Sequence, residues 1–256
     1  MTIDVVCCLD STYSMAGENI RKHIKGILGC LQAEQFGYTL FHDMPEHTQI
    51  RYKLLIFRDF NYSGSKDPIE ERPYTASPAE MGKVIDSVEF IGGGDKPESA
   101  MEALYYAMRS VTMTDESNNV REVGSLRQVI ILFTDSVPLR PEGLRNKSRR
   151  MRKNYPAQMP KTLKGLKKKW NEGDPVSLPG YQPGCGRLVI CAPFTDISRT
   201  RNVLNWYQVT EGLDRTWYVP VDFSQKIPQY EIVDFEQARR MILAQHPDQK
   251  EQEDGE

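Results

Sequence analysis

Short apolar runs alternate with amphipathic segments along the first part of the chain. Residues Ile3–Leu9 form an apolar run interrupted only by Asp4, which is typical of a strand buried on both faces of a parallel sheet. Apolar residues at helical spacing then predict a helix over Ile20–Leu31, and the apolar run in Gln49–Arg58 predicts a second strand. The stretch Asn61–Ser77 contains Pro, Ser and Gly and is expected to be a loop.

The same alternation continues after this loop. Pro78–Val88 predicts a short helix, Phe90–Ile91 a brief strand, and Met101–Met108 a helix with one apolar face. The most apolar strand is predicted at Gln128–Phe133. Two further strands and a closing helix are expected over Arg187–Ala192, Thr216–Val221 and Phe235–Ile242. Elements of these lengths in this order predict an α/β fold, with a doubly wound, mostly parallel sheet and helices on both faces.

Charge is distributed unevenly along the chain, although its net charge is only −2. Between Arg140 and Lys169 there are twelve Lys or Arg residues and one acid, Glu142. We therefore expect a single domain over residues 1–245, with a basic insertion over residues 139–183 after the fourth main strand. The acidic residues 246–256 are expected to form a disordered tail.

Composition also bears on where the protein works. Hydrophobic residues make up 39% of the chain, which is enough for a buried core. No stretch approaches the roughly 18 apolar residues of a membrane helix, and the chain start lacks the basic region and cleavage site of a signal peptide. Three of the five cysteines, Cys7, Cys8 and Cys191, fall in predicted buried strands, where thiols act as small hydrophobic groups. We expect a cytoplasmic protein without membrane contact.

Oxygen-bearing side chains follow three of the predicted strands. They lie in Asp10–Ser14, in Gly92–Asp95 and in Thr134–Asp135. Ligands of open α/β sheets bind outside the carboxyl ends of the strands, and hard oxygen ligands suit Mg²⁺, Mn²⁺ or Ca²⁺ better than zinc or copper. One such cluster alone is equally well explained as a helix N-cap, and a glycine run as a plain turn. The agreement of three segments therefore favours a metal site.

The first segment, Asp10-Ser-Thr-Tyr-Ser14, has the pattern D-x-[ST]-x-S. It is followed in order by Phe57-Arg-Asp-Phe60, Gly92-Gly-Gly-Asp-Lys-Pro-Glu98 and Phe133-Thr-Asp135. In these motifs, which span residues 1–138, the chain resembles von Willebrand factor type A domains that carry a metal-ion-dependent adhesion site. The resemblance is to the intracellular and bacterial stand-alone members, and it implies a Rossmann-like fold.

The resemblance also implies which side chains bind the ion. The predicted metal ligands are Asp10, Thr12, Ser14, Asp95 and Asp135. In such sites the two hydroxyls contact the ion directly, and the carboxylates act mainly through bound water. The family usually has a threonine where this chain has Asp95, so Asp95 either adds a third negative charge or stays one shell further out. Neutral hydroxyls leave the cation electron-poor, with an octahedral position open for an Asp or Glu of a partner.

These residues lead to a functional hypothesis. We expect a non-enzymatic module that uses Mg²⁺ (or Mn²⁺ or Ca²⁺) to capture an acidic residue of a protein partner and so assemble a multiprotein complex. The resemblance adds a co-encoded ATPase, kinase or phosphatase as a candidate partner. All four histidines lie outside the three segments, which leaves no obvious nucleophile–base pair. The alternative is a Mg²⁺-dependent phosphohydrolase or phosphotransferase, but enzymes of the haloacid-dehalogenase type need a second aspartate where this chain has Thr12.

The basic insertion admits three interpretations. Its second cluster, Lys161–Lys169, predicts a basic helix with an apolar edge formed by Leu163 and Leu166 and followed by Trp170. This helix is either docked on the domain with its lysines in solvent, or part of a surface that attracts an acidic partner, or a nucleic-acid-binding element. Aromatic residues are too sparse here for a base-stacking platform, which argues against nucleic acid.

Overall fold

A computed structural model describes most of the predicted core of the protein. The described residues are 2–31, 40, 48–60, 67–93, 99–110, 126–139, 155–156, 158–193, 206–223, 230–234 and 237. Asp95, the acidic residues 246–256 and, apart from residue 237, the predicted closing helix lie outside this set. Residues 140–154, about the first third of the predicted insertion, lie outside it as well.

One seven-stranded sheet organises the molecule, in the order β3-β2-β1-β4-β5-β6-β7. The strands are β1 Thr2–Asp10, β2 Gln49–Phe57, β3 Ile69–Glu71, β4 Leu126–Phe133, β5 Gly186–Ala192, β6 Thr216–Pro220 and β7 Val233–Asp234. The five central strands are parallel, and the short edge strands β3 and β7 pair antiparallel. The predicted doubly wound, mostly parallel sheet is therefore confirmed.

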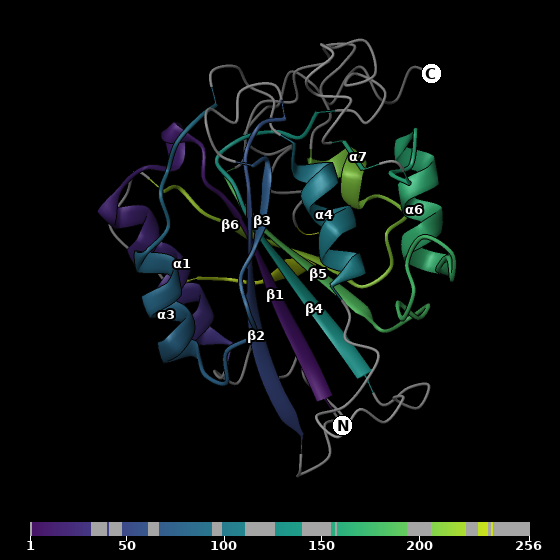
Figure 1. The fold of residues 1–256 in the computed structure, drawn as a ribbon, viewed down its shortest axis with the longest axis horizontal. Helices are drawn as coiled ribbons and strands as arrows, with labels where there is room; N and C mark the ends of the chain where they lie inside the picture. Colours follow the sequence, from purple (N-terminus) through teal and green to yellow (C-terminus); the bar gives the residue numbers. More distant parts are fainter. Residues whose placement is uncertain are drawn as a thin grey trace.

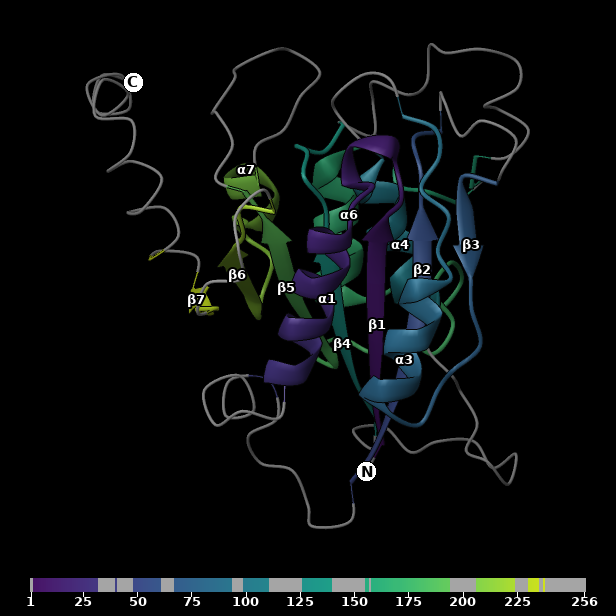
Figure 2. The ribbon, with the colours of Figure 1, turned by 90° about the vertical axis from the view of Figure 1, so that its left-hand side faces the viewer.

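Helices cover both faces of this sheet (Figures 1 and 2). One face carries α1 Glu18–Cys30 and α3 Pro78–Asp86, and the other carries α4 Ala100–Arg109, α6 Leu163–Glu172 and α7 Trp206–Thr210. Because successive strand residues point to opposite faces, β1 supplies Val5 and Cys7 to the core under α1 and Val6 and Cys8 to the core under α4. This double burial explains why most positions of β1 are apolar. In the described part of the chain, no helix combines the length and the apolar character needed to cross a bilayer.

The basic helix of the insertion, α6, is docked against the domain. Its apolar edge buries Leu166 and Trp170, and the Trp170 indole nitrogen donates to the carbonyl of Asp214 at 2.9 Å. Lys167 turns inward and donates to the carbonyls of Gln208, at 2.8 Å, and Glu211, at the end of α7. At least one lysine of this helix therefore serves to fix α6 to α7 and is not part of an exposed basic surface.

Two sequence predictions were wrong in the region before α4. The predicted loop over Asn61–Ser77 contains β3, which pairs antiparallel with β2 from Leu55 to Phe57. The brief strand expected at Phe90–Ile91 is absent from the sheet. The backbone of Ile91 instead donates to the carbonyl of Ser11 at 2.9 Å. Ile91 thus contacts the loop after β1 and does not pair with a strand of the sheet.

Candidate metal centre

The predicted metal residues lie where the direction of the sheet winding reverses. From β1 the chain runs outward to β2 and β3, and from β4 it runs outward the other way to β5 and β6, so β1 and β4 are the central neighbours. Loops after two such strands diverge to opposite faces and leave a crevice at the carboxyl edge. Asp10 is the last residue of β1, and Asp135 lies two residues after the end of β4. The fold therefore brings together residues 125 positions apart in sequence.

Asp10 lies at the buried end of the cluster formed by Asp10, Thr12, Ser14 and Asp135. Its Oδ1 accepts hydrogen bonds from the Thr12 backbone nitrogen at 3.0 Å and from the Thr12 hydroxyl at 2.7 Å. Its Oδ2 accepts from the hydroxyl of Thr134 at 2.7 Å. Each oxygen of the carboxylate is thereby fixed in position, which holds the loop after β1 against the loop after β4.

The hydroxyls of Thr12 and Ser14 form the outer part of the cluster. They lie 3.2 Å apart, and the Ser14 hydroxyl donates to Oδ1 of Asp135 at 3.1 Å. Between them Tyr13 begins a short 3-10 helix that ends at the buried Met15, which anchors the loop in the core. The structure thus brings Asp10, Thr12, Ser14 and Asp135 together in one chain of oxygen contacts, and their role as metal ligands stays a prediction.

The glycine segment also reaches this loop, although its aspartate is not described. The carbonyl of Gly92 accepts from the backbone nitrogen of Tyr13 at 3.0 Å. Gly92 and Gly93 have φ angles of 78° and 75°, a region that residues with a Cβ rarely adopt. These glycines are therefore needed for the chain to turn beside the loop after β1. Asp95 follows two residues later and lies outside the described residues, so its role as a ligand stays a prediction.

Thr134 supports the candidate site through a contact that the sequence does not predict. It belongs to the Thr134–Asp135 segment but is not among the predicted ligands. Its buried hydroxyl donates to Asp10 and also accepts from the backbone nitrogen of Ser136 at 3.2 Å. A hydroxyl residue directly after a central strand is the only signal in the sequence, and it does not reveal the partner.

Burial dominates the electrostatics of Asp10. Loss of water contact raises the pKa of this carboxyl to about 6, although the hydrogen bonds from Thr12 and Thr134 act to lower it. The charge of Asp135 raises it further. The site therefore holds a carboxylate in the protein interior beside a second carboxylate, an arrangement that a nearby cation stabilises.

The donor set fits a hard divalent cation. Thr12 and Ser14 direct their hydroxyl hydrogens at carboxylate oxygens, which leaves oxygen lone pairs available to an ion. Adjacent oxygens in a Mg²⁺ octahedron are about 2.9 Å apart, given ligand distances of about 2.0–2.1 Å. The 3.2 Å separation of the two hydroxyls is close to this spacing. No group of three Asp, Glu, His or Cys side chains suited to a metal occurs in the described part of the chain, so this candidate site depends on its hydroxyls.

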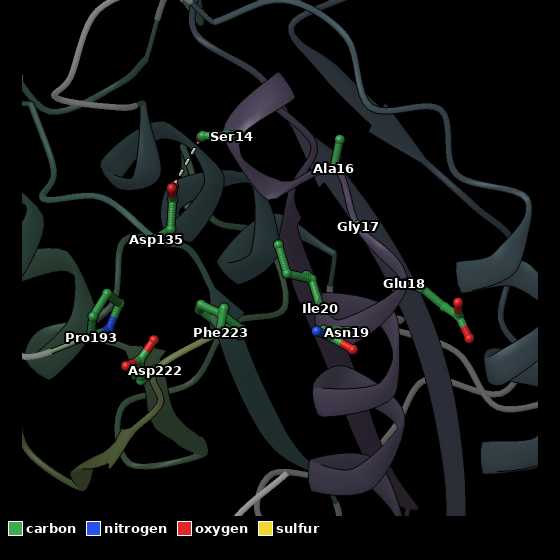
Figure 3. Close-up of a pocket in the computed structure, with 10 residues that line it drawn as sticks. All are labelled: Ser14, Ala16, Gly17, Glu18, Asn19, Ile20, Asp135, Pro193, Asp222 and Phe223. Carbon is green, nitrogen blue, oxygen red and sulfur yellow. Dashed lines mark hydrogen bonds between the residues drawn. The ribbon is translucent and has the colours of Figure 1, made fainter. Parts of the chain in front are cut away.

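A pocket of about 700 Å³ opens beside the cluster (Figure 3). Ser14 and Asp135 lie at one end of it, and Asp222 and Pro193 lie at another. Ile20 and Phe223 lie between these ends, and both are largely buried. The pocket therefore joins the polar cluster to the ends of β5 and β6.

Comparison with known proteins gives similarity of fold only. No family model and no curated protein matches the chain. Solved structures with a similar fold include the pilus adhesin SpaC from Lactobacillus rhamnosus GG, at 13% identity over 96% of this chain and 30% of that chain (TM-score 0.47). The conserved hypothetical protein BatB from Bacteroides thetaiotaomicron is 13% identical, over 94% of this chain and 95% of that chain (TM-score 0.42).

A third similar structure contains a metal. It is the proximal thread matrix protein 1 from the mussel byssus, solved with a zinc-occupied MIDAS motif, at 11% identity over 87% of this chain and 44% of that chain (TM-score 0.44). The chain thus spans less than half the length of SpaC and of the mussel protein. At such identities the similarity describes the overall fold.

Proposed function

We propose that this protein is a non-enzymatic binding module that captures an acidic residue of a protein partner through a divalent cation, with Mg²⁺ as the first candidate. The observation that carries the proposal is the placement of the Thr12 and Ser14 hydroxyls within hydrogen-bond distance of the carboxylates of Asp10 and Asp135, to which they donate. This orientation supports binding of a cation by neutral oxygen atoms, with the carboxylates behind them. It also agrees with the resemblance to type A domains with a metal-ion-dependent adhesion site.

The bound ion would supply an electropositive centre for one carboxylate oxygen of the partner. Ser14 is exposed and Asp135 is half-buried, whereas Asp10 and Thr12 are buried, so the cluster has an inner and an outer side. A partner approaching from the outer side meets Ser14 first. Two neutral hydroxyls near the ion leave more of its charge available to the partner than four carboxylates would.

The placement of catalytic residue types supports binding over catalysis. His23 is the single histidine in the described part of the chain, and its Nδ1 is hydrogen-bonded to the Tyr230 hydroxyl at 3.0 Å inside the core. Thr12, at the position where a phosphotransferase of the haloacid-dehalogenase type needs its general acid, donates to Asp10. A threonine hydroxyl is a poor general acid because it does not ionise in the working pH range.

The first test measures binding of Mn²⁺, as a probe for the hard-cation site, by isothermal titration calorimetry. We expect the wild-type protein to bind one ion, and Ser14→Ala to lower the affinity at least tenfold, about 1.4 kcal/mol. The matched control is Ser11→Ala. Ser11 lies in the same loop, but its hydroxyl contacts the carbonyl of Phe57 at 3.4 Å and not the cluster.

Equal Mn²⁺ affinity in the wild type and in Ser14→Ala would remove the proposed role of the hydroxyls. Absence of Mn²⁺ binding by the wild type, with Ca²⁺ and Mg²⁺ also inactive, would end the metal proposal altogether. Reduced binding in Ser11→Ala as well would indicate that the loop is merely sensitive to substitution.

A further inference from the structure

Tyr13 presents an exposed aromatic ring beside the candidate metal centre. Two large hydrophobic side chains are exposed in the described part of the chain, Tyr13 at 75% and Val176 at 81%. Tyr13 lies between Thr12 and Ser14, whose hydroxyls are the proposed neutral ligands of the cation. Among the described residues, the Tyr13 side chain makes no hydrogen bond and no ring contact. The ring is therefore available to a molecule that approaches the ion.

The backbone of Tyr13 is held in place, although its ring is exposed. Its N–H donates to the carbonyl of Gly92 and its carbonyl accepts from the N–H of Ala16, both at 3.0 Å. Thr12 before it and Met15 after it are buried. The exposure of the ring thus comes from the shape of a fixed turn. An aromatic side chain on such a backbone loses little conformational entropy when a partner covers it, because it has few rotatable bonds.

The groups around the ring determine which side chain would cover it. Ser14 is exposed beside it, and a cation held there would repel a Lys or Arg placed against the ring. A second acidic side chain would meet the negative face of the aromatic ring. An aliphatic or aromatic side chain meets neither penalty, and removal of its surface and of the ring from water is favourable.

We infer that the partner segment carries an Asp or Glu for the cation and, within about two positions of it, an aliphatic or aromatic residue that packs on the ring of Tyr13. Tyr13 directly precedes Ser14, and consecutive Cα atoms lie about 3.8 Å apart, which sets this spacing. The inference rests on the proposed function, since the cation holds the acidic residue. It adds a specificity determinant, because an acidic segment with only polar neighbours would bind more weakly.

The test begins with a library of random short peptides displayed on phage and selected on the immobilised protein in Mg²⁺, with EDTA as the reference. We expect enrichment of peptides that carry an acid with an aliphatic or aromatic residue close to it. The most enriched peptide is then synthesised, and its Kd is measured by fluorescence anisotropy in Mg²⁺. Tyr13→Ala is expected to raise this Kd by roughly tenfold or more, and Tyr13→Phe by less than about threefold, because Phe keeps the ring.

Two controls separate the ring from other effects. Val176→Ala removes the other exposed large hydrophobic side chain, in the segment between α6 and β5, and should leave the Kd of the peptide unchanged. The Mn²⁺ affinity of Tyr13→Ala, measured by calorimetry, should equal that of the wild type, because both backbone hydrogen bonds of residue 13 can still form. Weaker peptide binding by Val176→Ala, or weaker Mn²⁺ binding by Tyr13→Ala, would overturn the assignment, since the effect would then not come from a contact with the ring.

The remaining outcomes separate this inference from the function on which it rests. Enrichment of Mg²⁺-dependent peptides without an apolar neighbour, or an unchanged Kd in Tyr13→Ala, would overturn the contact and leave metal-dependent binding in place. An equal loss in Tyr13→Phe and Tyr13→Ala would assign the effect to the hydroxyl and would also overturn the apolar contact. Absence of any Mg²⁺-dependent enrichment, or equal selection by Ser14→Ala, would overturn both.

Discussion

Thr134 links the two central loops through a single hydroxyl. Its bond to Oδ2 of Asp10 is 2.7 Å long, and both residues are buried. In Thr134→Val the shape is kept but the donor is lost, which leaves a buried carboxylate oxygen without this partner. We expect the free energy of unfolding in urea at neutral pH to fall by about 1–3 kcal/mol.

Thr134→Ser is the control for this effect, because it restores the donor and removes only a methyl group. Stability of Thr134→Val equal to that of the wild type would show that the hydrogen bond contributes nothing net to folding. A loss of equal size in Thr134→Ser would assign the effect to the methyl group.

Helix α4 carries a second buried carboxylate, Glu102. Its Oε1 accepts from the Tyr155 hydroxyl at 2.6 Å, and its Oε2 has no hydrogen-bond partner among the described residues. Tyr155 also packs edge-on against Phe60, with ring centroids 5.4 Å apart. This contact ties the chain that follows residues 140–154 to α4, close to the carboxyl edge of the sheet.

Glu102 makes stability depend on pH. Burial raises the pKa of its carboxyl from 4.5 to about 7, against the lowering effect of the Tyr155 bond. Between these two values the folded chain retains a proton that the unfolded chain has released, so stability falls as pH rises through this window. At 1.36 kcal/mol per pKa unit, the free energy of unfolding falls by about 3 kcal/mol in total between the two pKa values, and this loss is complete above pH 7.

We expect Glu102→Gln to be the less pH-sensitive protein, because the amide does not ionise. Urea unfolding at a series of pH values from 4.5 to 8 would measure the difference in slope between this variant and the wild type. Parallel stability curves for the two proteins would show that Glu102 is not the group responsible. Glu172→Gln, at an exposed i,i+4 pair with Lys168 on α6, serves as the control and should leave the slope unchanged.

The candidate metal site joins both halves of the doubly wound sheet, so binding of an ion there should stabilise the whole domain. A ligand that binds only the folded state at 100 times its Kd adds about 2.7 kcal/mol. For a chain of this size we therefore expect Mg²⁺ to raise the thermal midpoint by about 5–10 °C over EDTA. Differential scanning fluorimetry measures this shift, and Ser14→Ala should lose most of it. Identical midpoints in Mg²⁺ and EDTA for the wild type would contradict the proposed link between the ion and the fold.

The sequence by itself determined the order and type of the main elements. Apolar runs such as Ile3–Leu9 and Gln128–Phe133 identified the central strands, because a strand buried on both faces carries apolar side chains at most of its positions. Helical spacing identified α1 and α4. The polar segments at the strand ends also predicted that Asp10, Thr12, Ser14 and Asp135 lie together, since parallel strands end at the same edge.

Only the tertiary structure decided which contacts these elements make. The bond between Thr134 and Asp10, the antiparallel pairing of β3 and the contact between His23 and Tyr230 join residues from different elements. The pocket that both Ser14 and Asp222 line likewise depends on the relative position of the chain before α1 and the chain after β6. Local periodicity reports which face of an element is buried, whereas strand register and helix docking decide what that face meets. Side-chain partners distant in sequence are therefore fixed by packing.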